Sequence, residues 1–125
     1  MDFTQAGVIL YTQNYRECVD FYGDALGLDL MFEIDRTGEK LTTFSLGGIY
    51  LMIEPGGTAH VGIKSAEKYT TEFRFTVTNL QATCNKLRRK GVSVAIIEHH
   101  WGTTAEFSDP DGNKCALRSS SGFGS

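Results

Sequence analysis

The stretch AEFSDPDGNKCAL, residues Ala105 to Leu117, carries the clearest fold signal in this chain. A hydrophobic run stops at Asp-Pro-Asp-Gly-Asn and then resumes. A calcium-binding loop starting at Asp109 would need glycine at its sixth position and a bidentate acid at its twelfth, but Lys114 and Ser120 stand there. Proline, aspartate, asparagine and glycine are the residues of tight turns. The stretch therefore predicts a hairpin corner between two strands and no calcium site.

The composition limits the possible partners. A chain of 125 residues suits one domain, and a formal net charge of −3 indicates no general attraction to nucleic acid or to an anionic membrane. The basic run KLRRK, Lys86 to Lys90, is expected to be the solvated end of a helix. No apolar run approaches the roughly 20 residues that cross a bilayer, and no signal peptide is evident. We expect neither a nucleic-acid nor a membrane partner.

The three cysteines form neither a disulfide framework nor a zinc pattern, because they are odd in number and widely spaced. Cys18 and Cys84 lie on expected helices, where a small buried hydrophobic residue is the usual role. This use of cysteine indicates a reduced, cytoplasmic location.

One supersecondary pattern occurs twice along the chain. Gly27 and Gly91, which are expected to end two helices, are 64 residues apart, as are Gly48 and Gly112 at two corners. Helix starts are expected at Asn14, with Glu17 completing a capping box, and at Thr78 or Asn79. The predicted strands begin at Gly7 and span 28–34, 40–48 and 49–55 in the first copy, and 72–77, 92–97, 103–108 and 113–118 in the second.

The expected fold class is α+β, with two tandem strand-helix-strand-strand-strand units. We expect one domain, 1–125, with unit one at about 5–55, a linker at 56–69, unit two at about 70–118 and a loose tail at 119–125. The units are expected to form a curved mixed sheet around a cleft, with the helices on the outer face. Strand alternation turns Leu51 and Phe73 toward a helix and Met52 and Arg74 away from it. The second set is either a solvated face or the lining of that cleft.

This arrangement resembles the vicinal oxygen chelate superfamily, which includes glyoxalase I, extradiol dioxygenases, fosfomycin-resistance enzymes and bleomycin-resistance proteins. The matching pieces are NYRECVDFYGDALGL from Asn14, NLQATCNKLRRKGV from Asn79 and WGTTAEFSDPDGN from Trp101, and the match runs from about Gly7 to Arg118. The pattern is specific for the fold and far less so for function, because such a scaffold hosts many chemistries.

Metal-using relatives bind a divalent ion through four side chains, and the resemblance places those positions at Gly7, Met52, Glu72 and Ala116. Gly7 and Ala116 offer no ligand atom, and a methionine sulfur suits softer ions than these enzymes use. If this assignment were shifted by one position along the same face of the strand, Glu54, which lies on the same face as Met52, would be added. The resemblance therefore implies a metal-free site without a cofactor, as in bleomycin-resistance-type members. The three histidines, His60, His99 and His100, are expected at the surface or the rim of the cleft.

The remaining candidates describe a site for a small molecule, with aromatic walls and a few polar groups. Trp101 with Gly102 resembles the Trp-Gly step of bleomycin-resistance-type members, although a packed loop aromatic is an equal alternative. Glu72, the only candidate base, and Arg74 could equally form a surface ion pair. The expected ligand-binding residues are Ile9, Tyr11, Tyr50, Met52, Glu54, Glu72, Arg74, Trp101 and Ala116.

Three functions are compatible with these features. The leading hypothesis is a protein that sequesters or carries a small aromatic or cationic molecule. The second is a lyase, dioxygenase or thiol transferase, either metal-dependent or using Glu72 as a base. The third is an interaction module with a filled cleft. In each case we expect a homodimer, because short sheets leave edges that a second copy could cover.

Overall fold

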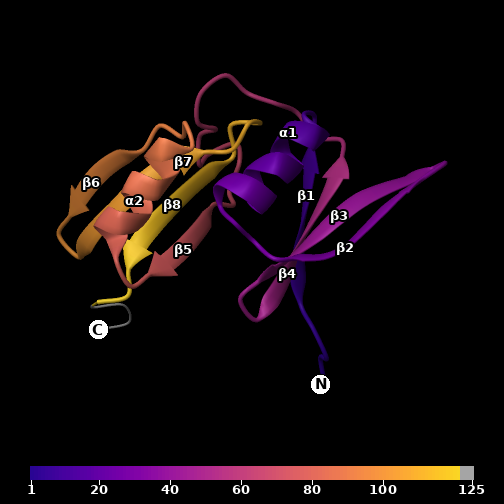
Figure 1. Cartoon of the computed structure of the whole chain (residues 1–125), viewed down its shortest axis with the longest axis horizontal. Helices are drawn as coiled ribbons and strands as arrows, with labels where there is room; N and C mark the ends of the chain where they lie inside the picture. Colours follow the sequence, from indigo (N-terminus) through magenta and orange to yellow (C-terminus); the bar gives the residue numbers. More distant parts are fainter. Residues whose placement is uncertain (122–125) are drawn as a thin grey trace. The chain divides into compact units, whose positions relative to one another are not determined.

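The computed structural model describes residues 1–121 and shows the strand-helix-strand-strand-strand pattern twice (Figure 1). The chain divides into two compact units, and the second unit begins at His60. The first contains β1 (Gly7–Thr12), α1 (Tyr15–Asp20), a π-helical turn η1 (Phe21–Ala25), β2 (Leu30–Arg36), β3 (Glu39–Leu46) and β4 (Ile49–Pro55). The second contains β5 (Phe73–Val77), α2 (Leu80–Arg89), β6 (Ala95–His99), β7 (Gly102–Ser108) and β8 (Lys114–Ser119).

Each unit forms its own four-stranded mixed sheet, and the two sheets have the same strand order. The orders are β1-β4-β3-β2 and β5-β8-β7-β6. In both units the first and last strands pair in parallel, while the remaining pairs are antiparallel. The predicted α+β class with two tandem units is confirmed.

The two helices begin differently. The side chain of Asn79 accepts a hydrogen bond from the Ala82 amide at 3.0 Å, as predicted for the start of α2. Asn14 is the N-cap of α1, but its side chain makes no capping hydrogen bond. The capping box predicted for Asn14 and Glu17 is therefore wrong. The backbone of Asn14, at φ −106° and ψ 68°, lies outside the extended region that a capping residue typically adopts.

Both helices end at the predicted glycines, and this shortens the strands that follow. Gly27 has φ 70° and Gly91 has φ 87°, the left-handed conformation that closes a helix. The next amides turn back to the helix, with Leu28 donating to the Tyr22 carbonyl at 3.0 Å and Val92 to the Leu87 carbonyl at 3.1 Å. Because these residues belong to the caps, β2 and β6 start later than predicted, at Leu30 and Ala95.

Each core lies between the helix and one face of its sheet. The side chains of Cys18 and Tyr22 on the first helical segment are fully buried, as are Leu51 and Ile53 on β4. In the second unit the buried side chains on the helix and on the sheet face toward it are Phe73, Cys84, Leu87, Ala105, Phe107, Cys115 and Leu117. The predicted burial of both helical cysteines and the predicted alternation along β4 are confirmed.

The Asp-Pro-Asp-Gly-Asn stretch forms the corner between β7 and β8, as predicted. The buried carboxylate of Asp109 accepts hydrogen bonds from the amides of Asp111 and Asn113, both at 2.9 Å, and from the Asn113 side chain at 2.7 Å. Gly112 follows with φ 86°. The acid therefore binds its own turn, which is the structural role expected of aspartate in corners.

The corner also fastens the segment that the sequence predicts as a loop-like linker. The carbonyls of Asp111 and Gly112 accept the amides of His60 and Lys64, each at 2.9 Å, and Lys64 Nζ donates to Asn113 Oδ1 at 2.7 Å. At the end of β8 the amide of Ser120 donates to the Val77 carbonyl at 2.9 Å. Residues 122–125 of the predicted loose tail lie outside the described residues.

Within residues 1–121, no helix is long and apolar enough to cross a membrane.

Candidate ligand-binding faces

In each unit the sheet has one face turned away from the buried core, which we call its open face. On the open face of unit 1, Ile9 lies beside Met52 and Tyr11 beside Glu54 in the β1–β4 register. Ile9 and Tyr11 are exposed, and Tyr50, Met52 and Glu54 are half-buried. The structure therefore brings five of the predicted site residues together on one surface.

An aromatic ring covers the N-terminal end of this face. A Cβ atom added at Gly7 would lie 2.4 Å from carbons of the Tyr50 ring, so the ring sits directly over the glycine. Gly7 and Tyr50 are also register partners. The glycine lets this aromatic side chain lie flat against the strand.

The open face of unit 2 carries charged side chains in the corresponding place. Arg74 pairs in register with Ala116, and Ala116 pairs with Glu106 on the other side. Glu72 precedes the first residue of β5, so its predicted place within the strand is wrong by one residue. Ala116 is fully buried, so the surface here is made by its longer neighbours.

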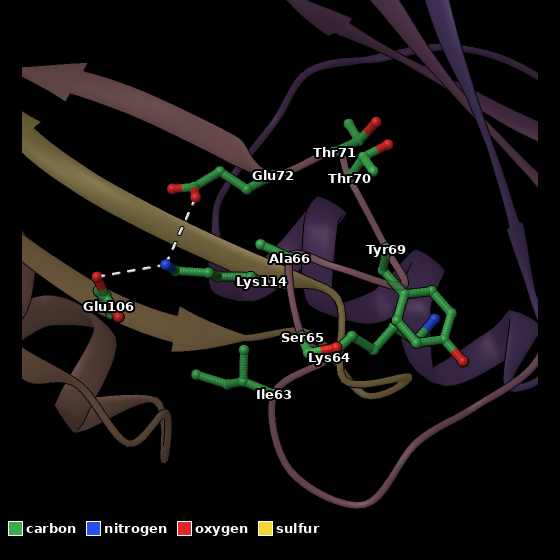
Figure 2. Close-up of a pocket in the computed structure, with 10 residues that line it drawn as sticks. All are labelled: Ile63, Lys64, Ser65, Ala66, Tyr69, Thr70, Thr71, Glu72, Glu106 and Lys114. Atoms are coloured by element: carbon green, nitrogen blue, oxygen red, sulfur yellow. Dashed lines mark ion pairs between the residues drawn. The ribbon is translucent and has the colours of Figure 1, made fainter.

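These charged residues form a chain of ion pairs. Arg74 Nη2 lies 3.3 Å from Glu72 Oε2, and Lys114 Nζ lies 3.5 Å from Glu72 Oε1. Lys114 Nζ also lies 3.5 Å from Glu106 Oε2, so one ammonium is shared by two carboxylates (Figure 2). Both oxygens of Glu72 therefore face cations. To act as a base or as a metal ligand, this carboxylate would first have to release them.

Trp101 lies among cations and remains partly open to solvent. Its indole stacks on the His99 ring at 4.4 Å with the planes 8° apart. The guanidinium carbons of Arg74 and Arg118 lie 5.4 and 5.3 Å from the centre of the indole, within the range of cation–π attraction. His99 is held in turn by Thr104, with Nε2 and Oγ1 2.9 Å apart. The indole is 41% exposed, so it is packed on protein groups and still offers surface to a ligand.

A pocket of about 400 Å³ adjoins the ion pairs in unit 2. Figure 2 shows Lys114 reaching between Glu72 and Glu106 on one side, with the segment 63–71 on the other. Lys64, only 7% exposed, belongs to this segment, and its Nζ lies 4.8 Å from the centre of the Tyr69 ring. The lining residues are Ile63, Lys64, Ser65, Ala66, Tyr69, Thr70, Thr71, Glu72, Glu106 and Lys114.

A smaller pocket of about 280 Å³ lies in unit 1 on the helix side of the sheet. It is lined by Arg16, Val19, Asp20, Gly23, Asp24, Leu28, Leu30, Glu33, Thr42 and Phe44. None of the predicted site residues contributes to it.

The residues at the expected metal positions do not fit a divalent ion. Gly7 has no side chain, Ala116 has no donor atom, and Met52 supplies only a thioether sulfur, which hard and borderline ions bind poorly. Glu72 is the one carboxylate among the four, and it is paired with Arg74 and Lys114. Within residues 1–121, no group of three or more histidine, cysteine, aspartate or glutamate side chains could hold a metal ion.

Several residues on the open face of unit 2 were not among the site residues predicted from the sequence. Lys114 contacts the predicted residue Glu72, and Arg118 contacts the predicted residue Trp101. Glu106 pairs with Lys114. Strand alternation could have found Lys114 and Arg118, because they share the parity of Ala116 along β8. The segment 63–71 could not have been found in this way, because loops have no periodicity.

The family and structural comparisons agree with this architecture. The family model for the "Glyoxalase/Bleomycin resistance protein/Dioxygenase superfamily" matches residues 4–117. No curated protein matches the chain. The antibiotic-binding protein TnmS3 from Streptomyces sp. CB03234 is similar in structure, with a TM-score of 0.71, 21% identity and coverage of 95% of this chain and 98% of that one.

Two further solved structures show the same fold. The lactoylglutathione lyase of Agrobacterium tumefaciens has a TM-score of 0.73, 15% identity and coverage of 99% of this chain and 98% of that one. A mutant of the fosfomycin resistance protein FosX of Listeria monocytogenes, complexed with Mn(II), has a TM-score of 0.72, 14% identity and coverage of 94% and 90%. With the family model spanning nearly its whole length, the chain belongs to the glyoxalase/bleomycin resistance protein/dioxygenase superfamily.

Proposed function

We propose that this protein binds a small aromatic or cationic compound without a metal ion, and sequesters or carries it. The observation that carries the proposal is the partly exposed indole of Trp101, held among polar groups on the open face of unit 2. Small-molecule sites combine aromatic surface with a few placed polar groups. The antibiotic-binding protein TnmS3 is a structural neighbour, which supports this use of the scaffold.

The geometry favours the aromatic part of this ligand class. His99 holds the indole in a fixed orientation, so little side-chain entropy is lost when a flat compound stacks on it. The open face of unit 1 is, by itself, a separate apolar and aromatic surface at Ile9, Tyr11, Tyr50 and Met52. For a cationic compound, Glu54 and Glu72 are the carboxylates on the two open faces among the predicted site residues, and a cation at Glu72 would have to displace Arg74 or Lys114.

Trp101 is the only tryptophan, so its fluorescence reports binding directly. A flat aromatic compound should quench this emission, and Trp101→Ala should weaken binding several-fold or more. Stacking on one ring contributes about 0.5–1.5 kcal/mol beyond the buried area, and the substitution also removes that area. Trp101→Phe keeps a ring and should retain part of the affinity. A broad panel that leaves both the emission and the melting temperature unchanged would favour the interaction module.

Glu72→Gln tests the polar wall separately, because it removes charge and keeps shape. It should weaken cationic ligands much more than neutral ones. Equal losses for both classes, measured by calorimetry, would mean that Glu72 holds structure and does not select the ligand.

Metal content separates this proposal from metal-dependent chemistry. Because two of the four expected positions lack donors, protein purified without chelator should carry well under one equivalent of zinc, nickel, iron or manganese. Near-stoichiometric metal that is lost in Glu72→Ala would contradict the proposal. So would glutathione-dependent methylglyoxal turnover that appears on addition of nickel or zinc.

A further inference from the structure

We infer that the acidic helix side of unit 1 docks on the basic edge of unit 2 in a second copy of this chain. This contact is separate from the proposed ligand binding. Two surfaces of opposite charge make it, and not unpaired strand edges alone. The division of charge between the units and the positions of exposed side chains support it.

The two units carry opposite net charges. Unit 1, residues 1–59, has nine acidic and three basic side chains and thus a formal charge of −6 with histidine neutral. Unit 2, residues 60–125, has six acidic and nine basic side chains and thus a formal charge of +3. Although both units repeat one supersecondary pattern, each attracts the other kind and repels its own.

Acidic side chains of unit 1 lie on the helix side of its sheet. Asp20 and Glu33 line the smaller pocket there together with Arg16. The guanidinium of Arg16 is divided between them, at 3.9 Å from the Asp20 carboxylate and 4.0 Å from that of Glu33. All three side chains are exposed, and two carboxylates share one cation. This surface therefore remains acidic.

Exposed apolar side chains adjoin the acidic surface. Leu30 lines the same pocket and is exposed, and Met31 and Phe32 follow it along β2. β2 is an outer strand of its sheet and pairs only with β3. Consecutive exposed apolar residues on an unpaired edge are typical of a surface that another chain covers.

The basic charge of unit 2 is concentrated at the end of α2, beside the edge strand β6. Lys86, Arg88 and Arg89 occupy its last turn, and all three are exposed. Arg88 Nη2 donates to the carbonyl of Val94, directly before β6, at 3.0 Å. Within residues 1–121, the side chains of Lys86 and Arg89 take part in no ion pair. These two cations can therefore meet the carboxylates of another copy.

The edge strand β6 matches β2 in character. It pairs only with β7, and its Ile96 and Ile97 are exposed (Figure 1). Each unit thus presents an apolar outer strand beside charged helical residues, with opposite sign of charge. A two-fold axis would form the contact twice, unit 1 to unit 2 in each direction, as a homodimer requires. Repulsion between like charges disfavours pairing of unit 1 with unit 1.

Two double variants test the contact: Lys86→Glu with Arg89→Glu, and Asp20→Lys with Glu33→Lys. Light scattering on the full native chain at micromolar concentration should give twice 13.8 kDa. Each variant alone should have the mass of one chain, because its facing surfaces repel. An equimolar mixture of the two variants should recover the doubled mass, since both contacts of the mixed pair again join opposite charges. Far-UV circular dichroism checks that each variant is folded.

Lys68→Glu is the matched control, because Lys68 is exposed in the same unit but lies before β5, away from α2. Arg89→Glu makes the same change of charge at the basic edge and should raise the Kd of the dimer about tenfold. Lys68→Glu should change it by less than about twofold. Lys86→Gln with Arg89→Gln, a milder change, should raise the Kd several-fold where charge reversal disturbs folding.

A native protein with the mass of one chain overturns the inference and leaves the proposed ligand binding standing. Double variants that keep the doubled mass on their own also overturn it. A mixture that keeps the mass of one chain would mean that these charges act within a chain, which overturns it as well. Equal effects of Arg89→Glu and Lys68→Glu would mean that net charge governs association, and not the basic edge.

Discussion

The two open faces belong to sheets of the same strand order, but their side chains differ in chemistry. In unit 1 the β1–β4 register aligns Gly7 with Tyr50 and Ile9 with Met52. In unit 2 the equivalent pairs on the first and last strands are Glu72 with Lys114 and Arg74 with Ala116. An aromatic ring over a glycine is thus replaced by an ion pair, while the pairing of strands is unchanged.

This difference shows which residues specify the fold and which are free to specify a ligand. The glycines that end the helices and the buried core side chains recur in both units, because each unit needs the same helix end and the same buried face. The exposed side chains of the open faces, such as Ile9 and Tyr11, contribute little to either core, so they can change without loss of the scaffold. Thr43 and Ala116 lie on the same faces but are buried, so they are less free to change. That freedom is the physical reason why one fold supports many functions.

The corners provide the test with the largest expected effect. A Cβ at Gly112 would lie 2.5 Å from the Gly62 carbonyl oxygen and 2.8 Å from that of His60, whereas one at Gly47 would meet nothing within 4 Å. Both glycines have positive φ, 86° and 64°. Gly47→Ala should therefore cost only about 1 kcal/mol of backbone strain.

Gly112→Ala should cost about 3 kcal/mol or more, because its methyl group collides with backbone that cannot move aside without breaking the corner's hydrogen bonds. Urea unfolding of the two variants measures the difference. Equal losses of unfolding free energy in the two variants would mean that the 60–64 segment does not hold the corner at Gly112. The two corners would then differ in sequence but not in how tightly they are packed.

Measuring the oligomeric state tests whether a second copy of the chain covers the edge strands of the two sheets. The outer strands of each sheet, β1 and β2 in unit 1 and β5 and β6 in unit 2, leave edges that a second copy could pair with or cover. The edge strand β2 also exposes three consecutive apolar side chains, Leu30, Met31 and Phe32. We predict a homodimer at micromolar concentration, with a mass by light scattering of twice 13.8 kDa. A single-chain mass across a wide concentration range would contradict this.

The fold could be predicted from the sequence because most ends of its helices and strands have a local chemical cause. Gly27, Gly91 and Asn79 specify helix ends through backbone conformation and capping, and these act over a few residues. The capping box predicted at Asn14 was wrong, because asparagine is a common capping residue but the backbone of Asn14 does not have the extended conformation of a cap. The π-helical turn after Asp20 has no sequence signal of comparable strength.

Less of the candidate site could be predicted from the sequence, because its contacts are not local. Alternation along a strand identifies the face of Arg74 and Lys114 but not the atoms that they contact. The stacking of His99 on Trp101 and the sharing of Lys114 depend on side-chain conformations and on register between strands far apart in sequence. The segment 63–71 contributes to the pocket through a path that no periodic pattern encodes.

The smallest expected effect concerns the helices, which also differ between the units. The last turn of α2 carries Lys86, Arg88 and Arg89, whereas that of α1 carries no basic residue. In α2, burial raises the pKa of the Cys84 thiol, and the nearby Arg88 partly opposes this. Burial therefore outweighs the cation, and Cys84 stays a protonated, apolar group in the folded protein.

The pH dependence of stability follows from the direction of this shift. In the unfolded chain a cysteine ionises near its ordinary pKa of about 8.5, whereas in the folded chain Cys84 ionises only at higher pH. Above about pH 8.5 the unfolded state binds fewer protons than the native state, so the free energy of unfolding falls as pH rises. The slope from this one group cannot exceed about 1.4 kcal/mol per pH unit.

Cys84→Ala should abolish this contribution while keeping a small apolar side chain at the fully buried position. Urea unfolding of both proteins at about pH 7.5 and about pH 9.5 isolates the effect, because all other titrating groups are shared. The stability lost on raising the pH should be smaller in Cys84→Ala, and Arg88→Gln should enlarge it by removing the opposing cation. Identical losses in Cys84→Ala and the native protein would mean that the thiol ionises alike in the folded and unfolded chains, and that burial against β8 does not outweigh the charge of Arg88.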